Sequence, residues 1–132
     1  MHPPETALQK PIKVTRGQLW EADFELQTHQ EDPGKRGRPA LIIQTNILNE
    51  AGHATTIVIP GTTQMYRDAQ GDGYPLCVSL GKPGQMKEDT DLLIDQIRTI
   101  SNRHLMGDKP IAVLSHAHMK RVEDALRILT GA

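Results

Sequence analysis

Three positively charged side chains lie close together in one short stretch of the sequence. Lys35, Arg36 and Arg38 belong to Lys35-Arg36-Gly37-Arg38-Pro39, directly before an apolar run. An arginine guanidinium is planar, and its N–H donors match the geometry of a phosphate group. The stretch is therefore a candidate phosphate-binding loop. The alternative is a solvated loop that carries charge without a ligand.

Hydroxyl and amide groups follow a second apolar run, residues 55–60. Thr62, Thr63 and Gln64 come after Gly61 and can hydrogen-bond to a phosphate or to the edge of a base. The alternative is a polar turn whose side chains satisfy its own backbone.

Two charged residues, Asp95 and Arg98, interrupt a third apolar segment, residues 91–100. Charged groups are costly to bury unless they are paired or have a function. The pair therefore indicates either a functional site or a structural ion pair in a half-exposed strand.

Other chemistries find little support in the sequence. His116 and His118 are two positions apart, a spacing that does not place side chains together on a helix. There is no HExxH, GxGxxG, Walker or GxSxG motif. Cys77 is the only cysteine, which excludes an intrachain disulfide. We therefore expect no metal and no other cofactor.

The hydrophobic pattern predicts short strands followed by one helix. Alternation in the first strand places Trp20 and Phe24 on the same side, with Trp20 in the core. Ser115 and Gly131 suit the two ends of a helix whose apolar residues recur every three or four positions. Residues 46–53 and 61–73 are read as connections, and 101–109 as holding a short helical turn. The predicted strands are 18–24, 40–45, 55–60, 74–80 and 91–100.

Length and composition fit one small domain of the mainly β (α+β) class, a β-barrel or sandwich. The chain has 132 residues, 37% of them hydrophobic and 3% aromatic, with a formal net charge of −1. That charge argues against a protein that coats nucleic acid non-specifically. We expect a flexible tail over residues 1–15 and one domain over 16–132. With one cysteine, no signal peptide and no membrane-spanning run, a cytoplasmic location is expected.

Taken in order, four segments resemble the MazF/PemK family of toxin endoribonucleases. They are RGQLWEADF, GKRGRPALII, TIVIPGTTQ and DLLIDQIRTI, and the likeness extends from about Arg16 to Leu129. The resemblance implies a small SH3-like β-barrel with a C-terminal amphipathic helix, in a homodimer whose groove binds RNA. It also implies metal-independent cleavage of single-stranded RNA at short sequences, to 2′,3′-cyclic phosphate and 5′-hydroxyl ends. A cognate MazE-like antitoxin would inhibit the enzyme.

By the same resemblance, Arg38 would bind the scissile phosphate and Thr62 would hydrogen-bond to it, while Thr63 and Gln64 would shape the pocket. The RNA groove would collect basic side chains, for which the candidates are Lys35, Arg36, Arg38, Arg67 and Arg98.

The general base stays open at this point. Glu31 is favoured, with His29 and Asp32 also in range. Asp95 matches an aspartate that acts in catalysis in one branch of the family. That branch has an arginine where this chain has Leu93, which argues against a mechanism centred on Asp95.

Two other functions remain as rivals. One is a poison of DNA gyrase of the CcdB type, which shares this architecture and has no nuclease centre. The other is a catalytically inactive barrel that binds RNA or protein. The GRP and TTQ motifs argue against the gyrase poison, while the inactive barrel predicts binding of RNA or protein without a cleavage product.

Overall fold

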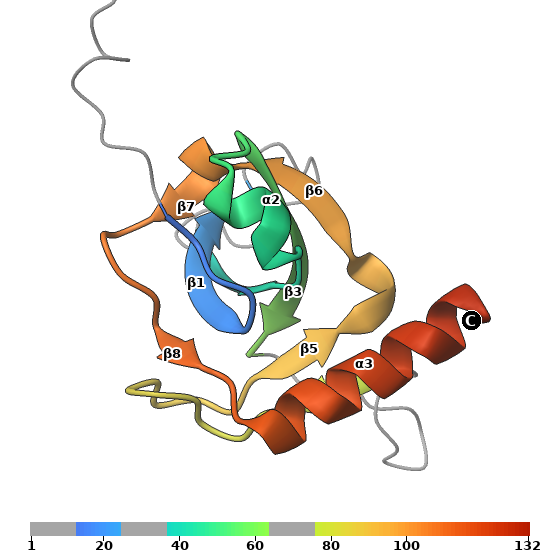
Figure 1. Ribbon diagram of the computed structural model, residues 1–132. Helices are drawn as coiled ribbons and strands as arrows, with labels where there is room; N and C mark the ends of the chain where they lie inside the picture. The colour runs from blue at the N-terminus through green and yellow to red at the C-terminus, as the bar shows by residue number, and fades with distance from the viewer. Residues whose placement is uncertain (1–12, 25–36, 64–75) are drawn as a thin grey trace, which may run out of the picture.

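A curled antiparallel sheet with a C-terminal helix on one face forms the framework of the molecule (Figure 1). The computed structural model describes residues 13–24, 37–63 and 76–132. Within these residues the sheet has eight strands, in the order β4-β5-β3-β2-β1-β7, while β6 pairs with β3 and β8 with β1. The strands are β1 (Gln18–Asp23), β2 (Gly37–Ile42), β3 (Thr55–Thr62), β4 (Cys77–Ser79), β5 (Asp91–Leu93), β6 (Arg98–Ser101), β7 (Leu105–Met106) and β8 (Ala112–Val113).

Four helical segments complete the described part of the chain. Two are α-helices, α2 (Asn46–Glu50) and α3 (His116–Thr130). The other two are 3₁₀ turns, η1 (Ile94–Gln96) and η2 (Asn102–His104). The mainly β fold with a C-terminal helix is thus confirmed, as is the helical turn expected within 101–109. No helix in the described ranges is long and apolar enough to cross a membrane.

Period-two alternation along β1, β2 and β3 gives the sheet two apolar faces. One face packs against α3, and we call its buried residues the α3-side cluster. The opposite face holds the inner cluster, which includes Trp20 as predicted. The α3-side cluster is Leu19, Leu41, Ile43, Ile59, Val78, Leu80, Leu92, Ile94, Val122 and Ala125. The inner cluster is Val14, Trp20, Ala22, Phe24, Ala40, Ile42, Val58, Ile100 and Leu105.

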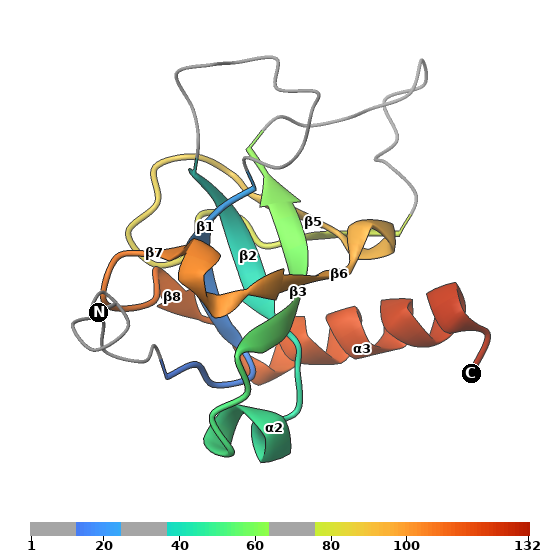
Figure 2. The same ribbon diagram turned by 90° about the horizontal axis from the view of Figure 1, so that it is seen from above.

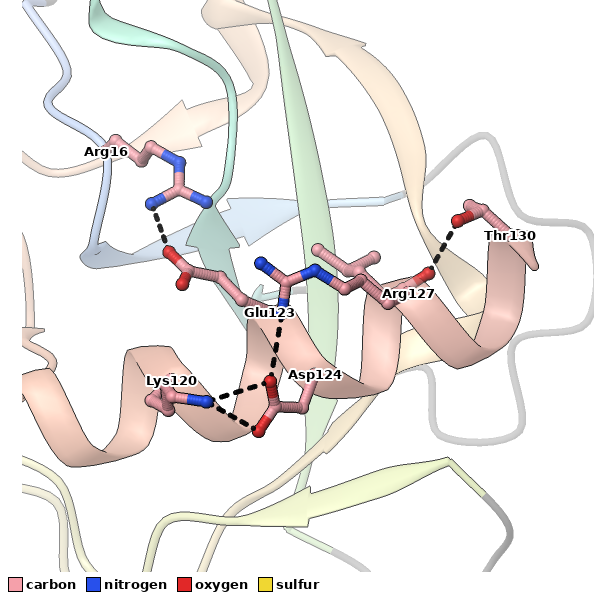
Figure 3. A network of polar contacts seen from close by, with 7 residues as sticks. Arg16, Lys120, Glu123, Asp124, Arg127 and Thr130 are labelled. Atoms are coloured by element: carbon pink, nitrogen blue, oxygen red, sulfur yellow. Dashed lines mark hydrogen bonds and ion pairs between the residues drawn. The ribbon is translucent and has the colours of Figure 1, made fainter. Parts of the chain in front are cut away.

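The ends of α3 follow the predicted capping pattern. The Ser115 hydroxyl accepts a hydrogen bond from the His118 N–H, and Gly131 adopts a left-handed conformation with φ of 77°. Arg16 joins the start of the described chain to this helix, because its Nη1 lies 3.1 Å from Glu123 Oε2 (Figure 3).

Strand boundaries differ from the prediction at two of the candidate site residues. β2 begins at Gly37 rather than residue 40, so Arg38 lies in a strand and not in a loop. β3 likewise continues to Thr62, two residues beyond the predicted end. Polar side chains favour a loop prediction at these positions, but backbone hydrogen bonding to neighbouring strands does not depend on the polarity of the side chain.

The segment 91–100 is not one strand. β5 pairs with Gly61 and Thr62 of β3, β6 pairs with residues 55–58, and η1 lies between them. Pro60 falls in the gap between these two pairings and has no N–H with which to extend a ladder. The prediction of one continuous strand over residues 91–100 is therefore wrong.

Residues 46–53 also contain more structure than the predicted connection. The helix α2 begins after Thr45, whose hydroxyl accepts from the Ile47 N–H. Asn49 of this helix is bound to Gln44, which precedes it. The Gln44 Nε2 donates to Asn49 Oδ1 at 2.9 Å, and Asn49 Nδ2 donates to the backbone carbonyl of Gln44 at 3.1 Å. These buried amides satisfy each other and fix the connection between β2 and β3.

The end of the sheet opposite α2 is where β1 ends, β2 begins and β3 ends (Figure 2). Antiparallel pairing requires this, since β2 runs against both of its neighbours. Residues at these three strand ends are therefore brought together although they are far apart in sequence.

Candidate functional site

Four polar residues on adjacent strands form a line across the sheet, which we call the polar row: Arg38, Thr62, Asp91 and Ser79. Thr62 pairs directly with Asp91, and Asp91 pairs with Ser79. Between β2 and β3, Ala40 pairs with Pro60, so the same register carried two residues further sets Arg38 opposite Thr62. Residues opposite each other in a sheet share a face. The polar row thus brings together residues from β2, β3, β5 and β4.

Close packing on the other face supports this register. A Cβ on Gly61 would lie 3.4 Å from the Pro39 Cβ, which shows that these two positions are adjacent, as the extended register requires. The same Cβ would lie 3.1 Å from Thr90 Cγ2. Gly61 therefore lets β2, β3 and the start of β5 approach closely beneath the polar row.

The middle of the polar row is buried. Thr62 is 8% exposed and Asp91 is 3% exposed. The Ser79 Oγ donates a hydrogen bond to Asp91 Oδ1 at 2.8 Å. A carboxylate excluded from water needs such donors to offset the loss of hydration.

A second arginine, Arg98, lies beside the Arg38 end of the row. Its Cζ is 5.0 Å from the centroid of the Phe24 ring, within the range of a cation–π interaction. Burial lowers the pKa of the Arg98 guanidinium, and the positive charge of Arg38 lowers it further. The two guanidinium groups are therefore close enough to interact, and they bring two positive charges to this end of the sheet.

The structure brings three of the predicted site residues to one end of the sheet: Arg38, Thr62 and Arg98. Thr63 follows the end of β3 and is partly exposed, and Asp95 is exposed on η1. The other candidates lie outside the described residues: His29, Glu31, Asp32, Lys35, Arg36, Gln64 and Arg67.

Sequence reasoning missed Asp91, Ser79 and Phe24 as parts of this arrangement. Asp91 begins an apolar segment and Ser79 occupies an outward position in a short strand, so neither stands out locally. Only the pairing of β5 with β3 and β4 shows their connection to Thr62. In the described ranges, no group of three or more His, Cys, Asp or Glu side chains could hold a metal ion.

Comparison with known proteins identifies the family. The model of the PemK-like, MazF-like toxin of type II toxin–antitoxin systems matches residues 15–130. The chain belongs to this PemK/MazF toxin family. The resemblance seen in the four sequence segments is thereby confirmed.

Solved structures of PemK/MazF-like toxins share the fold. The toxin MazF-mt6 of Mycobacterium tuberculosis has a TM-score of 0.66 at 16% identity, over 86% of this chain and 96% of that one. MazF from Deinococcus radiodurans has a TM-score of 0.65 at 22% identity, over 90% and 97%. A mycobacterial endoribonuclease in complex with its cognate antitoxin has a TM-score of 0.63 at 21% identity, over 90% and 94%. No curated protein matches the chain significantly by sequence.

Proposed function

We propose that this PemK/MazF-family chain is a sequence-specific endoribonuclease that cleaves single-stranded RNA without a metal. It would leave 2′,3′-cyclic phosphate and 5′-hydroxyl ends, and a cognate MazE-like antitoxin would inhibit it. The observation that carries the proposal is the β2–β3 register, which when continued sets Arg38 opposite Thr62 at one end of the sheet, in a chain whose family match covers residues 15–130. A mycobacterial protein with a similar fold is an endoribonuclease in complex with its cognate antitoxin.

The arrangement suits cleavage by the RNA's own 2′-hydroxyl. That oxygen attacks the phosphorus, a base takes its proton, the bond from phosphorus to the 5′ oxygen breaks, and the 5′ oxygen receives a proton. Arg38 would bind the phosphate and stabilise the charge that develops on it, and Thr62 would hydrogen-bond to the same group. DNA lacks the 2′-hydroxyl and would not be cleaved by this route.

The base is proposed to be Glu31, with His29, Asp32 and Asp95 as alternatives. Arg38 is assigned an electrostatic role first, because a guanidinium holds its protons tightly and is a poor proton donor. Arg98 adds a second positive charge beside Arg38. Lys35, Arg36, Thr63, Gln64 and Arg67 are proposed to contact the rest of the RNA.

A homodimer would enlarge this site into a groove. The chain carries a formal net charge of −1, so RNA binding must depend on locally concentrated cations rather than on overall charge. Two protomers that face each other would double the number of arginines available to the phosphate backbone.

The deciding experiment incubates purified, antitoxin-free protein with a long single-stranded RNA in EDTA and maps the product ends. We expect discrete cuts at one recurring short sequence, with cyclic phosphate ends. Intact RNA from folded protein would overturn the proposal, and a gyrase supercoiling assay would then test the rival toxin activity.

Substitution of Arg38 tests the assignment of the site. We expect Arg38→Ala to lower kcat/KM for RNA by about 100-fold or more, as loss of a group that stabilises transition-state charge does. Arg38→Lys should recover only part of this if the planar fork matters. The matched control is Arg127→Ala on the exposed side of α3, which should cleave like the wild type. Wild-type cleavage by Arg38→Ala would show that the site lies elsewhere.

A further inference from the structure

Arg98 is a half-buried cation on the apolar inner face of the sheet. It pairs with Val58 of β3, and both Val58 and Ile100 belong to the inner cluster, so alternation along β6 directs Arg98 to the same face. A cation in such surroundings loses hydration, which is unfavourable unless other groups compensate. An apolar side chain would fill this position at lower cost, so an arginine here calls for a specific explanation.

The curl of the sheet brings the Arg98 side chain to the end that holds Arg38. After β6 the chain passes through η2 into β7, and β7 pairs with Ala22 of β1, so β6 and β1 border the same interior (Figure 1). The Arg98 Cζ lies 5.0 Å from the centroid of the ring of Phe24, two residues beyond Ala22. Ala22 is directly opposite Arg38. The effect of Arg38 on the pKa of Arg98 agrees with this closeness.

The contact with Phe24 holds the Arg98 guanidinium without cancelling its charge. The ring is neutral and buried, so it restricts the position of the cation and leaves the positive charge available to an anion. An oxyanion that enters between Arg38 and Arg98 is attracted by both, and its charge offsets the repulsion between them. The arrangement therefore fits one phosphate group contacted from two sides.

We propose that Arg98 is a second catalytic residue, whose guanidinium contacts the same scissile phosphate as Arg38. The inference rests on the proposed ribonuclease function, and it narrows the role of Arg98 from added charge in the groove to a contact with the reacting group. Attack by the 2′ oxygen increases the negative charge on the phosphate oxygens, and Arg98 stabilises that charge without transferring a proton. Phe24 fixes the guanidinium before RNA binds, so little reorganisation is needed during the reaction.

The first test compares Arg98→Met with the wild type. Methionine keeps an unbranched apolar side chain against Phe24 but has neither the charge nor the N–H donors. We expect Tm to be unchanged or higher, because the change removes a partly desolvated cation that lies beside another cation. We expect kcat for RNA to fall by about 100-fold, the usual loss when one group that stabilises transition-state charge is removed. Kinetics are measured well below the Tm of each variant, so that kcat reports on folded protein.

The division between kcat and KM shows where Arg98 acts. An arginine that contacts only a neighbouring phosphate contributes equally to ground-state and transition-state binding, so its loss raises KM and leaves kcat unchanged. For Arg98→Met we expect the loss in kcat, with a change of less than about 10-fold in Kd for an oligonucleotide that is 2′-deoxy at the cleavage position. Wild-type kcat, or a loss confined to KM and Kd, would overturn the inference.

Arg103→Met is the matched control for the loss of one positive charge. Arg103 is exposed on η2, where the Asn102 N–H donates to the Ala54 carbonyl beyond the opposite end of β3 from the site. We expect this variant to cleave like the wild type. A loss of kcat as large as that of Arg98→Met would mean that total charge alone sets the rate, which contradicts the inference.

A double variant tests whether the two arginines share one phosphate. Residues that act on the same group depend on each other, because removal of one displaces the group that the other must contact. We expect the loss of kcat in Arg38→Ala combined with Arg98→Met to be at least about tenfold smaller than the product of the two single losses. Single losses that simply multiply would place the two arginines on separate phosphates and refute the inference.

The wild-type control keeps the two proposals apart. If wild-type protein fails to cleave RNA, the proposed function fails. If the wild type cleaves and Arg98→Met cleaves equally well, only the inference about Arg98 fails.

Discussion

Phe24 allows two like charges to lie near each other at the end of the sheet. Arg98 places its guanidinium 5.0 Å from the ring centroid, while the charge of Arg38 lowers the Arg98 pKa. A cation over an aromatic face gains about 0.5–2 kcal/mol, depending on how far it is desolvated. The ring is 5% exposed and belongs to the inner cluster. The Phe24 ring therefore packs in the inner cluster and also contacts the Arg98 guanidinium of the candidate site.

Substitution of Phe24 should separate these two contributions. Phe24→Leu keeps an apolar side chain but removes the ring face, so Arg98 loses its cation–π partner. We expect kcat/KM for RNA to fall by about 2- to 30-fold, the equivalent of the interaction energy above. Phe24→Tyr retains the ring and should stay close to the wild type in steady-state kinetics. Equal activity in Phe24→Leu and the wild type would mean that Arg98 does not depend on the ring.

At the scale of elements, locally encoded features were predictable and register-dependent ones were not. The helix α3 is predictable because apolar spacing, Ser115 and Gly131 all act within the helix itself. Residue type and resemblance indicate Arg38 and Thr62, but the sequence predicts loops at both positions because a polar side chain does not reveal a ladder on the neighbouring strand. The placement of Asp91 between Thr62 and Ser79 depends on pairings between β3, β5 and β4, which no local pattern encodes.

The loop after β4 provides a prediction of its own. Gly84 has φ of +56°, and a Cβ there would lie 2.5 Å from the Ile111 carbonyl oxygen and 3.0 Å from Ala112 Cβ. Gly84→Ala should lower the free energy of unfolding by about 2–4 kcal/mol, since backbone strain and a steric clash combine. Urea denaturation monitored by circular dichroism measures this change.

Gly81→Ala is the matched control for this prediction. Gly81 also has a positive φ, +68°, but a Cβ there would meet nothing within 4 Å. Gly81→Ala should lower the free energy of unfolding by only about 1 kcal/mol, the cost of the left-handed conformation alone. Equal losses in the two variants would mean that the loop yields at Gly84 and is not fixed by the segment at 111–112.

At the scale of the whole molecule, one sheet serves two cores of different composition. β1, β2 and β3 contribute to both the inner and the α3-side cluster, because successive residues point to opposite faces. The helix α3 has two buried residues, Val122 and Ala125. The pairs Lys120 with Asp124 and Arg127 with Asp124 lie within α3 and do not attach it to the sheet, whereas the Arg16–Glu123 pair does connect α3 to the start of the described chain and, being partly exposed, adds little (Figure 3).

The strands β2 and β3 contribute to both clusters and α3 to one, which has a consequence for amide hydrogen exchange. Amides of β2 and β3 should exchange only through global opening, since releasing them disrupts both clusters. Those of α3 should exchange through a smaller opening in which the helix detaches and the inner cluster stays intact. Val122→Ala should therefore lower protection in α3 by more than in β3, as measured by exchange and mass spectrometry. Uniform protection across the two elements would instead mean that α3 and the sheet open as one cooperative unit.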